Sequence, residues 1–299
     1  MKKRIFYFNI TYSCNSNCIF CYSHNTYHNG IIHNEIDLND FEDYIDRYDV
    51  SVSDRVIING GEPLLHTDFM GILKILEKRK CETLVYTNGR LLNEFSFNEI
   101  CLPIRFIVPI HGNEDIHDKI TGVKGSYHET ISALKSFENN KKDLVDIKII
   151  INNEMIKSGN NFNDILYSFN EVYFNNAVHL TRMANTIISL RNKCQNIDND
   201  IASAYLKKLY LYFRNRAKII RIFDTCIKSL DELKKYACNP YPYELKVFFR
   251  DYNQERNIIL KKPDMPCRAD CDFCELCKSA VDEYKVLEIS QCKISENLE

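Results

Sequence analysis

The chain has 299 residues, 45% of them hydrophobic, which is enough apolar material for one large domain and an appendage. Its formal net charge is -2 with both signs interspersed, so we expect neither a nucleic-acid partner nor a membrane partner. No apolar stretch is long enough to span a bilayer, and the first apolar run, residues 5–10, is too short for a secretion signal. Thirteen cysteines without such a signal favour metal ligation in a reducing compartment over disulfides, and we expect a cytoplasmic protein.

A group of three cysteines follows the first predicted strand. Cys14, Cys18 and Cys21 are separated by three and then two residues, directly after the apolar run 5–10. Three thiolates can hold a 4Fe-4S cluster and leave the fourth iron open to bind another molecule. A structural zinc site is instead a closed tetrahedron, usually assembled from two pairs of ligands, and this part of the chain has a single triplet. The spacing therefore favours an iron-sulfur cluster.

Two further motifs follow the next two predicted strands, residues 55–58 and 83–86. The first is Asn-Gly-Gly-Glu-Pro at 59–63, and the second is Thr-Asn-Gly at 87–89. Ligands of α/β sheets bind at the carboxyl ends of the strands, so we expect the three loops to meet in one shared site. Paired glycines let the backbone approach a ligand closely, and Glu62 is an anionic acceptor suited to an ammonium group.

These three motifs, in this order, resemble those of the radical S-adenosylmethionine (SAM) superfamily. The resemblance implies that Cys14, Cys18 and Cys21 bind the cluster and that the amine and carboxylate of SAM chelate the open iron. It assigns the glycine-rich segment to the methionyl ammonium and the aromatic residue before the third cysteine to the wall beside adenine. The SAM-binding residues expected in these loops are Phe20, Gly60, Gly61, Glu62, Pro63 and Asn88.

The segment Val-Pro-Ile-His-Gly at 108–112 resembles peptide-modifying members of that superfamily. Those enzymes commonly have Val-Ser-Leu-Asp-Gly here, so Pro109 and His111 depart from the pattern. His111 is a candidate polar or proton-transferring group of the site, and the alternative is a hydrogen-bonded structural histidine. Asn152 and Arg182, at or beside later strand ends, are candidates for contacts to SAM, and the alternative for both is a solvated surface position.

Strand and helix patterns alternate to about residue 190. Six strands are predicted at 5–10, 55–58, 83–86, 104–109, 146–151 and 178–183, and helices at 69–79 and 126–137, the second with a Ser-x-x-Glu capping box. We therefore expect an α/β fold, a partial (β/α)6 barrel like that of the resembling superfamily, followed by a small cysteine-rich hairpin module. The predicted domains are the barrel at 1–200, a helical connector at 201–237 and the module at 238–299.

The predicted module carries a second group of cysteines. Two strand-like runs, 243–250 and 256–260, predict a hairpin ahead of this group, and Cys-x2-Cys-x2-Cys is the three-ligand portion of a ferredoxin cluster site. Zinc also accepts four thiolates and remains the alternative. Resemblance to SPASM and twitch extensions implies one auxiliary 4Fe-4S cluster. Its candidate ligands are Cys238, Cys267, Cys271, Cys274 and Cys277.

The resemblance implies that the enzyme cleaves SAM reductively to a 5′-deoxyadenosyl radical, which abstracts hydrogen from a substrate. An auxiliary cluster that accepts an electron favours net oxidation, such as a thioether or carbon-carbon crosslink in a ribosomal peptide or a protein. The alternatives are a small-molecule radical SAM enzyme, a glycyl-radical activase, a peptide epimerase and a non-catalytic iron-sulfur carrier. Expected partners are the precursor peptide or protein, an electron donor such as flavodoxin or ferredoxin and, because the chain begins at the first strand, a separate peptide-recognition protein.

Overall fold

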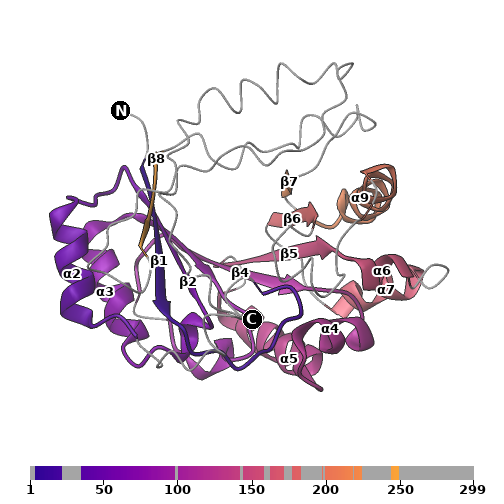
Figure 1. Ribbon diagram of the computed structural model, residues 1–299, viewed down its shortest axis with the longest axis horizontal. Helices are drawn as coiled ribbons and strands as arrows, with labels where there is room; N and C mark the ends of the chain where they lie inside the picture. The colour runs from indigo at the N-terminus through magenta and orange to yellow at the C-terminus, as the bar shows by residue number, and fades with distance from the viewer. Residues whose placement is uncertain are drawn as a thin grey trace, which may run out of the picture.

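The fold is an open parallel sheet with helices along its outer side (Figure 1). The computed structural model describes residues 4–21, 35–97, 100–141, 144–157, 162–171, 177–182, 197, 199–217, 219–223 and 244–248. The strands have the order β7-β6-β5-β4-β3-β2-β1-β8, and every neighbouring pair is parallel. They are β1 (Arg4–Thr11), β2 (Arg55–Gly60), β3 (Glu82–Tyr86), β4 (Ile104–Ile110), β5 (Val145–Ile151), β6 (Ala177–Arg182), β7 (Ile219–Phe223) and β8 (Glu244–Phe248).

The predicted α/β fold with six parallel strands in an unclosed barrel is confirmed over β1 to β6. The predicted helix at 69–79 is present with the same bounds, and the helix predicted at 126–137 continues to residue 141. The helices are α2 (Leu38–Arg47), α3 (Phe69–Arg79), α4 (Glu114–Thr121), α5 (Ser126–Lys141), α6 (Asn153–Lys157), α7 (Phe162–Ser168) and α9 (Asn199–Phe213). Short 3-10 turns are η1 (Pro63–Leu65), η2 (Leu92–Glu94) and η5 (Phe169–Glu171).

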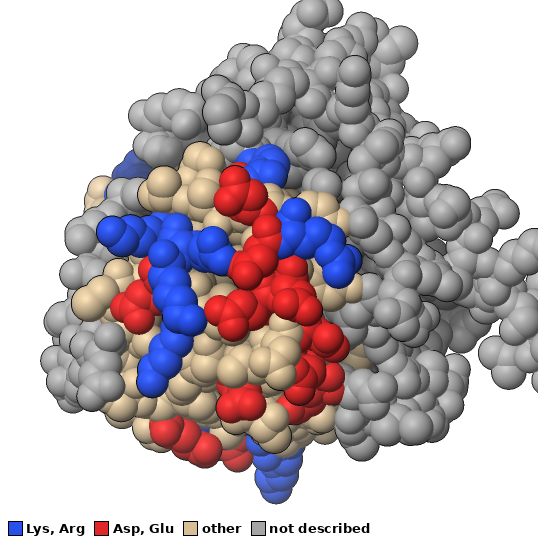
Figure 2. Space-filling view, turned by 90° about the vertical axis from the view of Figure 1, so that its left-hand side faces the viewer, with Lys and Arg blue, Asp and Glu red and all other residues tan. Residues whose placement is uncertain are grey.

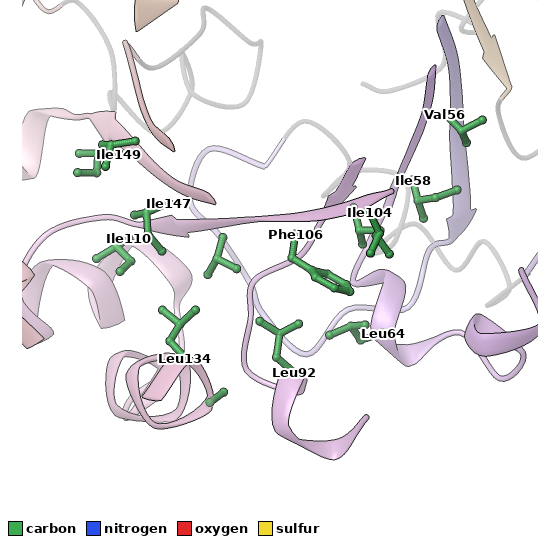
Figure 3. Close-up of a cluster of buried hydrophobic side chains, with 14 of the residues drawn as sticks. Val56, Ile58, Leu64, Leu92, Ile104, Phe106, Ile110, Leu134, Ile147 and Ile149 are labelled. Atoms are coloured by element: carbon green, nitrogen blue, oxygen red, sulfur yellow. The ribbon is translucent and has the colours of Figure 1, made fainter. Parts of the chain in front are cut away.

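The hydrophobic core lies between the sheet and its helices. Successive side chains of a strand point to opposite faces, so each strand gives every second residue to this core. Ile147 and Ile149 of β5 are buried in it together with Phe106 of β4. Figure 3 shows these side chains with Leu92 and Leu134, which belong to the layer outside the sheet. We call the opposite side of the sheet, turned away from the helices, the inner face.

The start of α5 is capped differently from the prediction. Ser126 and Glu129 do not form a reciprocal box, because Ser126 Oγ donates to Asp118 Oδ1 at 2.9 Å and Glu129 pairs with Arg90. The carboxylate of Asp118, in the second half of α4, also accepts from the backbone N–H groups of Gly125 and Tyr127. A carboxylate from the preceding helix thus satisfies the free donors at the start of α5.

The outer helices α2 and α3 mix acidic and basic side chains. Lys78 Nζ lies 3.2 Å from Glu42 Oε1, and Arg79 pairs with Asp46. Figure 2 shows both signs side by side on this part of the surface. Within the described ranges, no helix combines the length and the apolar character that crossing a membrane requires.

Two strands extend the sheet beyond the six predicted ones. β7 lies in the predicted helical connector, after α9, and pairs with β6. A strand was predicted at 243–250 as the first arm of a hairpin, and β8 occupies 244–248, where it pairs with β1 in parallel. The second arm, residues 256–260, lies outside the described residues, as do Cys238, Cys267, Cys271, Cys274 and Cys277.

Candidate active site

The loop after β2 is fastened to the cysteine loop after β1 by backbone hydrogen bonds. Gly61 N donates to Thr11 O at 2.8 Å, and Glu62 N donates to Ser13 O at 2.7 Å. A Cβ on Gly60 would lie 2.2 Å from Thr11 O, and one on Gly61 would lie 2.1 Å from Ser13 O. Gly60 also has a φ of +140°, which disfavours any side chain. The glycine pair is therefore required for the close contact between these two loops.

Glu62 links the same loop to the loop after β3. It is 1% exposed, and its Oε1 accepts from Thr87 Oγ1 at 2.6 Å and Leu64 N at 3.1 Å, while Oε2 accepts from Asn88 N at 2.7 Å. Burial raises the pKa of this carboxyl to about 7, against the effect of these donors. Since each carboxylate oxygen has two acceptor positions, Oε2 retains one for a ligand beyond the one taken by Asn88.

Asn88 and Arg90 hold the cysteine loop from the other side. Asn88 Nδ2 donates to Asn15 Oδ1 at 2.6 Å, and Asn88 Oδ1 accepts from Arg90 N at 3.0 Å. The Arg90 guanidinium donates to Asn15 O and Ser16 Oγ and pairs with Glu129. Sequence reasoning missed Asn15, Ser16 and Arg90. The available signal was position, because two of them lie between the cysteines and the third follows the Thr-Asn-Gly motif.

The three cysteines lie together on this loop. Ser16 N donates to Cys14 Sγ at 3.4 Å, and Cys21 N donates to Cys18 O at 3.0 Å. The Cys14 side chain reaches the surface but has enough protein around it that desolvation raises its pKa to about 11. Burial raises the pKa of Cys18 further, and the nearby Cys21 and Cys14 thiols add to this effect. Metal ligation requires thiolates, so these thiols would have to lose their protons for a metal to bind.

The donor set fits a three-cysteine cluster. In the described part of the chain, no three His, Cys, Asp or Glu side chains converge as they would around one metal ion. A cubane does not need such convergence, because its cysteines bind different iron atoms. Cys14, Cys18 and Cys21 share one loop and lie near enough for each to influence the ionisation of another. They are the residues that would hold the cluster.

Two buried histidines stand beside the cysteine loop. The Phe20 and His111 ring centroids are 5.3 Å apart in an edge-to-face contact, and the His111 and His117 centroids are 5.2 Å apart. His111 N donates to His117 Nδ1 at 3.3 Å. Burial, His117 and the Lys148 charge hold the pKa of His111 well below its usual value, and burial lowers that of His117 to about 4. Both rings are neutral at neutral pH.

Asn152 and Arg182 are the two remaining candidates, and the structure describes the side chain of Asn152 alone. Asn152 is 1% exposed, so it is not a solvated surface residue. Its Nδ2 donates to His111 O at 3.1 Å and its Oδ1 accepts from Met155 N at 2.8 Å, which caps α6 and ties it to the loop after β4. Arg182 is the last residue of β6, and its side chain lies outside the described part.

Comparisons with known proteins agree with this geometry. The sequence profile of the radical SAM superfamily matches residues 8–161, which include all three motif loops. Fe-coproporphyrin III synthase of Methanosarcina barkeri is 23% identical over 206 residues, 66% of this chain and 50% of the relative. The S-adenosylmethionine-dependent nucleotide dehydratase of Selenomonas ruminantium is 32% identical over 84 residues, 28% of this chain and 29% of the relative. The chain thus spans half of the first relative and less of the second.

A solved structure shares the fold. SuiB of Streptococcus suis, bound to its precursor peptide SuiA, superposes with a TM-score of 0.55 at 15% identity. The superposition covers 83% of this chain and 57% of SuiB. At this identity the likeness concerns the fold.

Proposed function

The chain belongs to the radical SAM superfamily, and we propose that it reductively cleaves SAM and uses the resulting 5′-deoxyadenosyl radical to abstract hydrogen from a substrate. The observation that carries this proposal is the joining of three motif loops, after β1, β2 and β3, into one hydrogen-bonded unit. A 4Fe-4S cluster bound to the cysteine loop, together with SAM, would supply the electron transfer and radical chemistry. The protein itself would hold the cluster, SAM and substrate in position and keep water away from the radical.

The residues around this unit would position SAM. The remaining acceptor position of Glu62 Oε2, with the backbone from Gly60 to Pro63, suits the methionyl ammonium. Phe20 offers a ring face for adenine, and Asn88 fixes the cysteine loop from the next strand. Because Gly61 and Glu62 are bonded to the same loop as Cys14, SAM held by them would lie next to the cluster.

We propose a ribosomal peptide or a protein as the substrate, with an oxidative modification such as a thioether or carbon-carbon crosslink. Two observations support this proposal: the resemblance of residues 108–112 to peptide-modifying enzymes, and the fold shared with a protein that binds a precursor peptide. A small-molecule substrate is the second candidate, because the two curated relatives are named for porphyrin and nucleotide chemistry.

Anaerobic SAM cleavage tests the function. The protein is reconstituted with iron and sulfide, given SAM and dithionite, and assayed chromatographically for 5′-deoxyadenosine. We expect product from the wild type and none from Cys14→Ala. Cys101→Ser is the matched control, since Cys101 is exposed and far along the chain from the cysteine loop, and it should match the wild type. A fully loaded wild type that makes no product, alone or with candidate peptides, would count against the proposal.

We also propose that Cys267, Cys271, Cys274 and Cys277, with Cys238 as a further candidate, bind an auxiliary 4Fe-4S cluster. Four cysteines within eleven residues support this assignment. The double variant Cys271→Ala with Cys274→Ala should contain about half of the wild-type iron, as expected when one of two clusters is lost, and should still cleave SAM. Unchanged iron would exclude the auxiliary cluster, and zinc in its place would favour the alternative.

A further inference from the structure

The C-terminal turn of α4 is bonded to the cysteine loop. Asn17 N donates to Thr121 O at 2.8 Å, and Ile19 N donates to Ile120 O at 2.9 Å. The last carbonyl groups of a helix have no partner within the helix, so these two bonds satisfy acceptors that would otherwise need water or a side chain. The two donors flank Cys18, the middle residue of the triplet. Helix α4 therefore holds the segment around this cysteine on both sides.

Gly122 allows the helix and the loop to come this close. It ends α4 in the left-handed conformation, with a φ of +68°. A Cβ at this position would lie 2.7 Å from Asn17 O, closer than a real Cβ approaches a backbone atom. Any other residue would therefore push the cysteine loop and the helix apart. Gly125 also has a positive φ, of +85°, but a Cβ there would have no described atom within 4 Å.

Helix α4 is fixed in the fold, so the loop is the part that would move. Ile120 is fully buried in the hydrophobic core, and Thr121 is 3% exposed. The Thr121 hydroxyl lies 2.6 Å from Ser126 Oγ, and the Asp118 carboxylate binds the start of α5. A side chain added at the end of α4 would act on the cysteine loop before it displaced the helix.

The bonds to α4 decide which N–H groups remain near the thiolates. Ser16 N donates to Cys14 Sγ at 3.4 Å, whereas the N–H groups of Asn17 and Ile19 are taken up by carbonyl groups of the helix. An N–H donor directed at a cluster sulfur or a thiolate stabilises the negative charge that reduction adds, and so raises the reduction potential. Withholding the two donors that flank Cys18 keeps the potential low.

The end of α4 also contributes through its dipole. The C-terminus of a helix carries a partial negative charge, which disfavours an added electron nearby. Lys119, the basic residue of the last turn, is paired with Glu154 at 2.5 Å, and Lys124 beyond the helix is exposed to solvent, which screens its charge. The dipole therefore acts in the same direction as the withheld donors.

We propose that the last turn of α4, with Gly122 as its contact residue, positions the Cys18 segment and keeps the reduction potential of the bound cluster low. Gly122 is a positioning residue, because it acts through the cysteine loop. A low potential suits a cluster that passes an electron to SAM. This inference deepens the proposed function and rests on the cluster proposed for Cys14, Cys18 and Cys21, whatever the substrate is.

The experiment compares variants of the anaerobically reconstituted full-length protein, in the Cys271→Ala, Cys274→Ala background so that a single cluster is titrated. Gly122→Ala adds a Cβ against the loop. Gly122→Asn adds the same Cβ, but Asn adopts the left-handed conformation more readily, so this variant separates the close contact from backbone strain. Gly125→Ala is the matched control, because it has comparable backbone strain and open space around its Cβ.

Two measurements are made on each protein. A redox titration followed by electron paramagnetic resonance gives the reduction potential of the cluster. Hydrogen exchange, followed by mass spectrometry of the peptide that covers residues 15–21, reports the bonds from the loop to α4. Urea denaturation measures how far each substitution destabilises the fold as a whole.

We expect both Gly122 variants to shift the reduction equilibrium about tenfold toward the reduced cluster, which is about 59 mV for one electron, and to exchange faster in the loop peptide. Gly125→Ala should keep the potential and the exchange of the unsubstituted protein, although its urea midpoint falls as far as that of Gly122→Ala. Equal potentials in all of these proteins, or an equal shift in Gly125→Ala, would overturn the inference. A protein that shows the expected shifts but whose wild type never cleaves SAM would support the inference and contradict the proposed function.

Discussion

The two faces of the sheet serve different purposes although they are made by the same strands. The outer face presents Phe106, Ile147 and Ile149 to the helices, and these side chains are at most 3% exposed. The inner face presents Tyr86, Pro109 and Lys148, all half-buried. Because neighbouring residues on a strand point to opposite faces, one residue of β5 is buried in the core while the next is half-buried on the other side of the sheet. Substitutions at adjacent positions should therefore have unrelated effects.

Phe106→Ala should give the largest loss of stability. Its ring is fully buried on the outer face, so truncation removes apolar contacts and leaves a cavity, at a cost of about 4 kcal/mol. Urea denaturation under anaerobic conditions measures this loss. The comparison of the two faces would fail if Phe106→Ala proved as stable as the wild type.

Asp146→Asn should give the second-largest loss of stability, because it removes a buried charge on the inner face. Arg105 and His179 would keep their positions without the carboxylate, and we expect a loss of about 3 kcal/mol at pH 7. Burial opposes ionisation of Asp146, but His179 and Arg105 outweigh it and lower its pKa. The folded pKa is below the unfolded one, so this contribution is present above about pH 4 and fades as the pH falls through the folded pKa.

Denaturation at several pH values tests whether the charge of Asp146 explains this loss of stability. Denaturation of the wild type and Asp146→Asn at pH 7, 5 and 3 should show two curves that approach each other at acid pH, because the wild type loses the ionised carboxylate. A difference that stayed constant down to pH 3 would show that packing, rather than charge, explains the loss.

Asp37→Ala, at the start of α2 in the outer layer, should lower the stability less than either of these two variants. Its carboxylate accepts from Asn39 N at 2.8 Å and caps α2, so we expect a loss of about 1 kcal/mol. Thermal denaturation compared with Asp40→Ala, in the first turn of the same helix, separates the cap from the general effect of an acidic residue there. Equal losses would mean that the hydrogen bond itself contributes little.

Lys148→Met should change stability least, by less than about 0.5 kcal/mol, because it removes a half-buried charge while keeping most of the side-chain volume. This variant would sharpen the contrast with the buried neighbours Ile147 and Ile149. A loss comparable to that of Phe106→Ala would place Lys148 in the folding core and contradict the division between the faces.

Much of the fold follows from local patterns. The runs at 104–109 and 146–151 are rich in β-branched residues and lie between turn signals, so their strands were predicted within a residue or two. The three motif loops also meet as expected, because parallel strands bring their carboxyl ends to one edge. These predictions needed only spacing and periodicity.

The features that sequence reasoning missed depend on partners distant in the chain. Nothing near Glu62 indicates that Thr87 and Asn88 will occupy most of its carboxylate. The cap supplied by Asp118 comes from the preceding helix, and the pairing of β8 with β1 joins opposite ends of the described chain. Such contacts depend on how elements pack, which local propensities do not encode.

The backbone bonds from Gly61 and Glu62 to the cysteine loop have a consequence for how ligands fill the site. Two loops fastened in this way become ordered together, so a ligand that orders one has already met part of the cost of ordering the other. Thermodynamic reciprocity then requires each occupant to raise the affinity of its neighbour by the same factor. Cluster insertion and SAM binding should be cooperative, with neither step independent of the other.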